Sequence, residues 1–208
     1  MINLDNSKYN DIIKAAFTQF IQYGFQKTTM ADIAVATGIS RPSIYTYFEN
    51  KEEIFKATCI WTNELSYENV KKILDNDREG WKINQKIEAA LFEYYGNLLE
   101  ITQSPHGNEI YDEHHRLCGE ITQQNTKKLC NLLTQALIKA NENGEINLDI
   151  IGASAQSYAE ILQLSVVGLK SKLTPLKTFK KRLNAFVKIF FAGLETPKGD
   201  KPVLTKAI

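Results

Sequence analysis

The sequence predicts an all-α protein, with a small N-terminal three-helix unit followed by a larger helical domain. The 208 residues include only 5 Pro and 11 Gly, so few helix breakers interrupt the chain. Apolar residues recur at spacings of three and four over several long runs, as they do on the buried face of a helix. A short segment, residues 28–51, carries the capping and turn residues of two closely spaced helices.

The composition fits an ordinary soluble globular protein, with 43% hydrophobic and 24% charged residues. No apolar run approaches the roughly 18 residues of a membrane span, and residues 1–9 lack the basic and apolar regions of a signal peptide. Three cysteines without C-x-x-C spacing favour reduced thiols that pack as small hydrophobic residues. We therefore expect a cytoplasmic protein that spans no membrane.

The net charge of +1 hides an uneven distribution of charged residues. Residues 1–51 hold five basic and four acidic residues, whereas residues 170–182 hold six basic and none acidic. Nucleic-acid binders usually carry a basic patch, and residues 1–51 are nearly neutral. DNA binding is therefore predicted here from the geometry of a motif and not from charge. The basic run is most simply a solvated loop and helix start, and a second nucleic-acid surface is the alternative.

The first helix is predicted over residues 9–23, where one apolar stripe repeats at helical spacing. Its members are Tyr9, Ile12, Ile13, Ala16, Phe17, Phe20 and Ile21. Gly24 follows as a C-terminal cap. Asp5, Asn6 or Ser7 can cap the start, and the sequence does not choose among them. This helix is expected to cover the next two.

The second helix is predicted over residues 30–37. Thr29 and Asp32 have the spacing of a capping box at its start. Ala34 is small enough for a crossing helix to approach, and Gly38 can adopt the positive φ of a sharp turn.

Ser40 is predicted to cap a third helix, with Pro42 in the first turn, where its missing N–H is not needed. Ile44 and Phe48 then turn inward. Two short helices joined by a tight turn form the helix-turn-helix pattern, whose second helix enters a DNA major groove.

The outer face of this third helix offers groups that can read base edges: Arg41, Pro42, Ser43 and Thr46. Arg41 can fork onto guanine O6 and N7. Ser43 and Thr46 can bond base edges or phosphates, and Pro42 or the Thr46 methyl can meet a thymine methyl.

Neighbouring residues are candidates for contacts to DNA phosphates. Tyr45 and Tyr47 each carry a hydroxyl at the end of a rigid ring, and for Tyr47 packing within the small domain is an equal alternative. Lys51, behind the N-cap residue Asn50, is a further candidate. Thr29 combines a capping role with a possible phosphate contact, because free N–H groups at a helix start attract anions.

The segment resembles the N-terminal signature of TetR-family transcriptional regulators, through the pattern G-F-x-x-T-T-M-x-D-I-A-x-x-x-G-I-S-x-x-x-I-Y-x-Y-F-x-x-K-E-E-I-F. The resemblance covers residues 9–57. It implies a homodimer that reads a palindromic operator in double-stranded DNA. It also implies a larger C-terminal helical domain that dimerises and binds a small-molecule ligand, which the sequence does not identify.

The resemblance also assigns roles by position. Base-reading positions correspond to Arg41, Pro42, Ser43 and Thr46, and backbone-contacting positions to Thr29, Tyr45, Tyr47 and Lys51. Some members place a base-reading Arg or Lys early in the second helix, where this chain has Met30 and Ala31. Base readout is therefore expected to fall mainly on Arg41 and Ser43.

Five further helices are expected over residues 51–75, 82–102, 109–142, 148–170 and 175–194, with residues 109–142 forming one kinked helix or two. Residues 76–80 are the best linker candidate. The expected domains are a DNA-binding domain over 1–50, a ligand-binding and dimerisation domain over 51–195, and a flexible tail over 196–208.

The apolar faces of the last two helices are wider than packing against a single hydrophobic core requires. A monomer core is one explanation, and an interface with a second subunit is favoured. The interface residues expected are Tyr158, Ile161, Leu162, Phe179, Leu183, Phe186 and Phe190.

A ligand pocket between the helices should combine apolar walls with a few polar groups. The candidates in the larger domain are Trp61, Phe92, Tyr95, Tyr111, His114, Cys118 and Tyr158. Adjacent residues on a helix point about 100° apart, so at most one of His114 and His115 faces inward. No spacing indicates a metal site, and no cofactor is expected.

The leading hypothesis is a transcriptional repressor that a ligand releases from its operator. A ligand achieves this only if it binds better to the state that has released DNA. A transcriptional activator and a helical protein-interaction module without an inducer are the alternatives. An enzyme is not expected, because G-x-S-x-G, H-E-x-x-H and a phosphate-cradling Gly-rich loop are all missing from the sequence.

Overall fold

The computed structural model describes residues 7–75, 80–170 and 174–194. Every regular element in these residues is helical, which confirms the predicted all-α class. The elements are α1 (Ser7–Tyr23), α2 (Met30–Thr37), α3 (Arg41–Ile44), α4 (Lys51–Asp75), α5 (Ile83–Thr102), α6 (Gly107–Glu142), the 3-10 helix η1 (Leu148–Ile151), α7 (Ala155–Leu169) and α8 (Leu176–Ala192). Within the described ranges, no helix is both long enough and apolar enough to cross a membrane.

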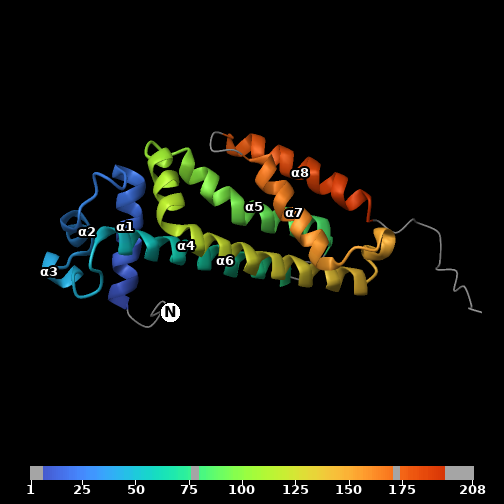
Figure 1. Cartoon of the computed structure of the whole chain (residues 1–208), viewed down its shortest axis with the longest axis horizontal. Helices are drawn as coiled ribbons and strands as arrows, with labels where there is room; N and C mark the ends of the chain where they lie inside the picture. Colours follow the sequence, from blue (N-terminus) through green and yellow to red (C-terminus); the bar gives the residue numbers. More distant parts are fainter. Residues whose placement is uncertain (1–6, 76–79, 171–173, 195–208) are drawn as a thin grey trace, which may run out of the picture.

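The molecule is elongated, with α1, α2 and α3 gathered at one end (Figure 1). Two long helices, α4 and α6, pack against each other along its length. Helix α5 packs against α4, α6 and α8, and α7 packs against α6 and α8. This arrangement separates the helix-turn-helix end from the α7–α8 end.

One hydrophobic core holds the N-terminal end together. It joins fully buried residues of α1, α2 and α3 to the first turns of α4, with Ile12, Ile33, Ile44 and Ile54 at its centre. Ile110 and Cys118 of α6 belong to the same core. The N-terminal core therefore reaches beyond residue 50 into α4 and α6.

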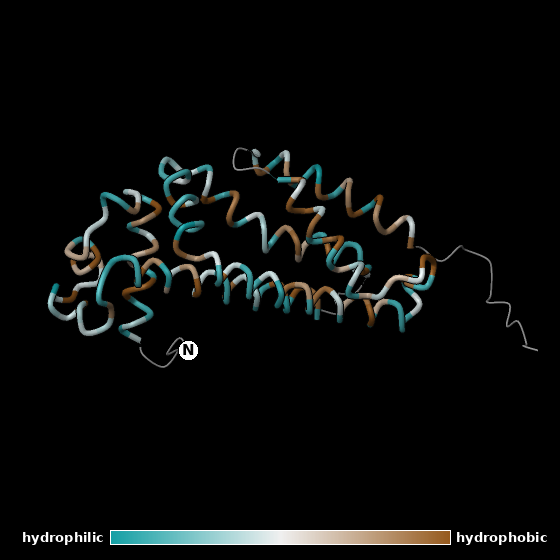
Figure 2. Tube along the Cα trace, in the orientation of Figure 1, coloured by the Kyte–Doolittle hydropathy of each residue, from teal (hydrophilic) through white to brown (hydrophobic). Residues whose placement is uncertain are grey.

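A second core fills the space between the end of α4 and helices α5, α6, α7 and α8. The residues of α8 that enter it, Phe179, Leu183, Val187 and Phe191, are spaced by four, so one face of the helix is apolar. Figure 2 shows this pattern as brown segments that alternate with teal along α8.

Local signals set the ends of the short helices. Gly24 (φ +86°) and Gly38 (φ +70°) end α1 and α2 in the left-handed region. Thr29 and Asp32 form the expected capping box, and the Ser40 hydroxyl accepts a hydrogen bond from the Ser43 N–H at the start of α3.

Some predicted elements differ from the structure. The single helix expected over 148–170 is wrong: η1 ends at Gly152 (φ +65°), and Ser154 then caps a new helix, α7. Residues 107–142 form one helix, which bends after its first turns (Figure 1). Most of the linker candidate (76–79), the tail (196–208) and the capping candidates Asp5 and Asn6 lie outside the described residues.

Candidate functional site

The helix-turn-helix end presents α3 and the turn that follows it to solvent. Ile44 is fully buried and Phe48 nearly so, and these two side chains fix which way the segment faces. The outward residues are consequently Arg41, Pro42 and Thr46, all exposed, with Ser43 partly exposed. The structure thus brings the four predicted base-reading residues onto one surface.

Arg41 is held in place by Tyr45, one helical turn further on. Arg41 Nη2 donates a long hydrogen bond to the Tyr45 hydroxyl oxygen, 3.4 Å away, and the guanidinium carbon lies 5.9 Å from the Tyr45 ring centroid. A long side chain supported in this way has fewer rotamers to lose when it binds. Both groups remain exposed and are available to a nucleic acid.

The predicted hydroxyl groups already make hydrogen bonds within the protein. Ser43 Oγ lies 2.8 Å from Ser40 Oγ, and the Thr46 hydroxyl donates to the Ser43 carbonyl oxygen at 2.7 Å. The Thr29 hydroxyl donates to Asp32 Oδ2 at 2.7 Å. Because the hydroxyl hydrogens of Thr46 and Thr29 are committed, these two groups would meet DNA as acceptors.

Two predicted phosphate contacts, Tyr47 and Lys51, are partly internal, and for Tyr47 this agrees with the packing alternative. Tyr47 is half-buried against the N-terminal core. The Lys51 ammonium donates to the carbonyl oxygens of Phe25 at 2.7 Å and Gln26 at 3.2 Å, and lies 4.4 Å from the Phe25 ring centroid. Burial lowers the pKa of Lys51. Its main role is therefore to tie the start of α4 to the α1–α2 turn, which leaves at most one ammonium hydrogen for a phosphate.

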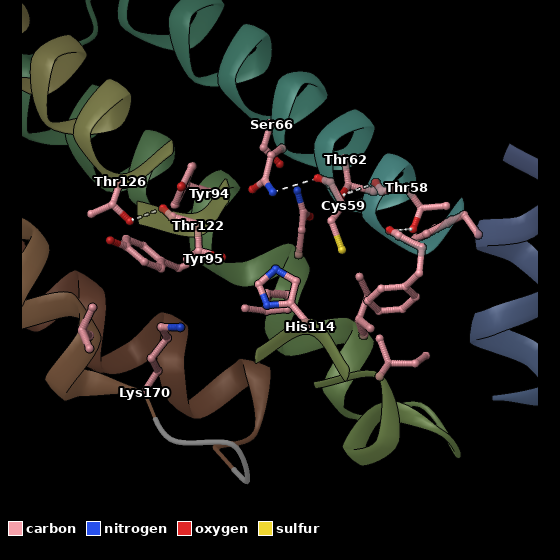
Figure 3. A pocket seen from close by; sticks show the side chains of 18 of the residues that line it. Thr58, Cys59, Thr62, Ser66, Tyr94, Tyr95, His114, Thr122, Thr126 and Lys170 are labelled. Carbon is pink, nitrogen blue, oxygen red and sulfur yellow. Dashed lines mark hydrogen bonds between the residues drawn. The ribbon is translucent and has the colours of Figure 1, made fainter. Parts of the chain in front are cut away.

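A cavity of about 510 Å³ lies between α1, α4, α5, α6 and α7 (Figure 3). Its volume falls in the range of small-molecule sites. The walls combine aromatic rings such as Phe17, Phe20 and Phe55 with hydroxyl, amide and basic groups. Phe20 and Phe55 also belong to the N-terminal core, so one wall of the cavity is the back of the helix-turn-helix unit.

Of the predicted pocket residues, Tyr95 and His114 line the cavity. The other five do not. Phe92 stacks on Phe179 with ring centroids 6.1 Å apart, and the Tyr158 hydroxyl donates to the Leu148 carbonyl oxygen at 3.1 Å inside the second core. Phe92 and Tyr158 therefore pack in the second core rather than in the cavity. Helical spacing shows that a face is apolar, but it does not show which segment packs against that face.

The remaining three predicted pocket residues are also placed elsewhere. Cys118 is fully buried in the N-terminal core. Trp61 packs edge-on against Phe17, and Tyr111 against His115. The thiols of Cys59, Cys118 and Cys130 are free and buried, in agreement with the expectation of reduced cysteines.

Several residues that line the cavity were missed from the sequence. Thr58 and Thr62 of α4 and Thr122 and Thr126 of α6 form two pairs four residues apart. Their hydroxyl groups donate to carbonyl oxygens of their own helices, which lets polar side chains sit in a largely apolar wall. For Thr58 and Thr62 the available signal was a pair of threonines at i, i+4 in an apolar run, whereas Thr122 and Thr126 lie in a polar stretch that gave no such signal.

Lys170 is another lining residue that the sequence analysis missed. It follows α7 directly, and its side chain points into the cavity (Figure 3). Its ammonium lies 5.1 Å from the Tyr95 ring centroid. Burial lowers the pKa of Lys170 and also that of His114. It raises the pKa of Tyr94 to about 12, so the phenol is neutral at pH 7.

The residues predicted for a dimer interface divide into two groups. Tyr158, Leu162, Phe179 and Leu183 are buried in the core of the protomer, which corrects their assignment. Phe186 and Phe190 are half-buried, and Ile161 is 46% exposed. The apolar residues that remain on the surface of α7 and α8 include Leu164 (73% exposed) and Ile189 (75% exposed).

Residues 12–58 match the family described as bacterial regulatory proteins, tetR family. The chain is 41% identical over 56 residues to a probable acrEF/envCD operon repressor of Escherichia coli K12, a match that spans 27% of this chain and 24% of that protein. It is 27% identical over 161 residues to the transcriptional regulator TtgR of Pseudomonas putida, covering 72% of this chain and 74% of TtgR.

Solved structures with the same fold cover nearly the whole chain. A transcriptional regulator from Cytophaga hutchinsonii has a TM-score of 0.73 at 19% identity, over 92% of this chain and all of that one. SmeT, the repressor of a Stenotrophomonas maltophilia multidrug efflux pump, has a TM-score of 0.63 at 18% identity, over 94% of both chains. At these identities the likeness concerns the fold.

Proposed function

From the match of residues 12–58 to the tetR family of bacterial regulatory proteins, we propose that this chain is a cytoplasmic, homodimeric, sequence-specific DNA-binding transcriptional regulator. It acts as a repressor that a small-molecule ligand releases from a palindromic operator. The observation that carries the proposal is the exposed surface of α3, where Arg41, Pro42, Ser43 and Thr46 stand outward on a fixed helix-turn-helix.

In the proposed complex, Arg41 and Ser43 read base edges, and Pro42 and Thr46 contribute contacts beside them. Tyr45, Thr29 and Tyr47 contact phosphates, and Lys51 uses its remaining ammonium hydrogen in the same way. Support for the leading role of Arg41 comes from its exposure and from the tyrosine that holds it.

The larger domain, over residues 51–195, is proposed to dimerise and to bind the ligand. Exposed apolar residues on α7 and α8 support a subunit interface there, because an apolar patch of this kind usually marks a partner site. The cavity supports ligand binding. A ligand that contacts Phe20 and Phe55 would touch the core that supports α3. It could therefore bind with different affinity to the DNA-bound and the DNA-released conformations.

Selection of DNA from a random pool, followed by titration of the selected operator, tests the proposal. We expect a palindromic site and a loss of affinity of about 10-fold or more for Arg41→Ala, with relaxed preference at one base pair per half-site. Arg182→Ala, which removes an exposed cation of the C-terminal basic run, is the control and should bind the operator like the unaltered protein.

Failure to select any sequence would contradict DNA binding. Unchanged affinity and preference in Arg41→Ala would contradict only the assignment of Arg41. Transcription from a promoter that carries the selected operator, with and without the protein, separates a repressor from an activator.

A further inference from the structure

The cavity contains a half-buried cation, Lys170, and no described residue supplies it with a counter-ion. Lys170 reaches the cavity from the end of α7, and its ammonium faces the Tyr95 ring. Glu160 is the one carboxylate among the described residues that line the cavity; it is exposed and accepts a hydrogen bond from Gln156 at 2.9 Å. Partial burial removes water from the Lys170 ammonium, so an anionic group placed beside it in the cavity would be stabilised.

His114 faces the same space from α6 (Figure 3). Burial, together with the nearby charges of His115 and Lys170, lowers the pKa of His114, so the ring is neutral at pH 7. A neutral imidazole still has one N–H to donate. Lys170 and His114 therefore offer two donors to one acidic group.

The opposite side of the cavity is apolar. Figure 3 shows α1 and Lys170 on opposite sides of the space. Helix α1 contributes Phe17, Phe20 and Ile21, and α4 adds Phe55. The cavity is thus polarised, with aromatic walls next to the helix-turn-helix core and hydrogen-bond donors at the end of α7.

We propose that the ligand of this cavity is a weak organic acid with an apolar, aromatic body, whose carboxylate binds between Lys170 and His114 while the body packs against Phe20 and Phe55. The inference rests on the ligand-binding role proposed above for the cavity. It explains how one small molecule spans from α7 to the core that supports α3.

Three probes with the same naphthalene body and different charges test this inference: 2-naphthoate, neutral 2-naphthamide and cationic 2-naphthylmethylammonium. Binding to the full-length protein without DNA is measured by calorimetry at pH 7. We expect 2-naphthoate to bind at least about 10-fold more tightly than the amide, the scale of one charge-assisted contact, and the ammonium compound to bind most weakly.

Lys170→Met keeps the aliphatic stem and removes the charge, and should reduce the preference for 2-naphthoate over the amide to about threefold or less. Lys180→Met is the matched control, because the Lys180 ammonium makes a similar contact, 5.3 Å from the Phe92 ring centroid, outside the cavity. That variant should retain the full preference.

Equal or tighter binding of the amide or the ammonium compound would overturn the inference, and so would the absence of binding by all three probes. An unchanged preference in Lys170→Met would do the same. The comparison of probes on the unaltered protein stands even if a variant folds poorly. The binding assay contains no DNA. Its result is therefore independent of whether the protein selects an operator, and the two proposals can fail separately.

Discussion

The Arg116 guanidinium donates a hydrogen bond to the Glu52 carboxylate at 2.7 Å and so joins α6 to the first turn of α4. The same guanidinium binds Glu113, one helical turn earlier in α6. Glu113 accepts a hydrogen bond from the Gln26 side chain at 2.9 Å, and Glu109 accepts one from the Gln26 backbone N–H. Helix α6 is thereby fastened both to the α1–α2 turn and to the start of α4.

These contacts predict that Arg116 limits how far the helix-turn-helix unit moves relative to the larger helical domain, which is proposed to bind the ligand. Arg116→Gln removes the link to Glu52 and should broaden the distribution of distances between the two recognition segments of the proposed dimer. Spin labels at Val35→Cys, an 82% exposed site in α2, report this distance by pulsed electron paramagnetic resonance.

Lys127→Gln is the control, because it removes an exposed cation further along α6. It should leave the distribution as in the unaltered protein. If Arg116→Gln also left it unchanged, the Glu52–Arg116 pair would have no part in coupling.

The capping box at the start of α2 predicts a pH-dependent contribution to stability. Hydrogen bonds from the Thr29 side chain and backbone lower the pKa of Asp32. A carboxyl whose folded-state pKa is lowered stabilises the protein above its unfolded-state pKa, and this contribution disappears as the pH falls through the folded-state value.

Thr29→Ala should therefore lower the free energy of unfolding by about 1 kcal/mol at pH 7. The difference from the unaltered protein should shrink as the pH falls below the ordinary pKa of an aspartate. Urea unfolding between pH 3 and pH 7 measures both quantities. A difference that stays constant with pH would show that the Asp32 carboxylate does not contribute.

The exposed apolar residues of α7 and α8 predict where the subunits of the proposed dimer meet. Ile189→Glu places a charge on a 75% exposed apolar position and should raise the dimer dissociation constant by about 100-fold or more. Sedimentation velocity across a concentration series measures it. Val35→Glu, which alters a similarly exposed apolar residue in α2, should not affect dimerisation, and a dimer that tolerates Ile189→Glu would place the interface elsewhere.

The helix-turn-helix segment also predicts a shallow salt dependence of operator binding. Residues 28–51 contain two cations, Arg41 and Lys51, and Lys51 is largely committed to the carbonyl oxygens of Phe25 and Gln26. Even if both cations of each half-site displaced counter-ions from DNA, the slope of log K against log salt concentration should be no steeper than about −4 for a dimer.

Titrating the operator at salt concentrations from about 50 to about 200 mM tests this prediction, because the slope can be measured over that range. A markedly steeper slope, reduced by Arg182→Ala, would indicate that the C-terminal basic run contacts DNA as well.

Most helices, and the exposed surface of α3 that is proposed to read DNA, could be predicted from local sequence signals. Caps such as Thr29 and Ser40, the left-handed Gly38 and the inward pair Ile44 and Phe48 act over a few residues, so their pattern is legible along the chain. Gly152 and Ser154 are capping residues of the same kind, and they separate η1 from α7. The prediction of one helix over 148–170 did not take them into account.

By contrast, tertiary packing determines which residues share the cavity and which apolar residues stay exposed. Lys170 and His114 are 56 residues apart, and Phe20 is further still, so their meeting depends on how α1, α6 and α7 pack. Leu162 and Ile189 are both apolar residues on helices, yet one is buried and the other exposed. Helical periodicity specifies that a face is apolar, whereas the neighbour that covers it is set by the packing of distant segments.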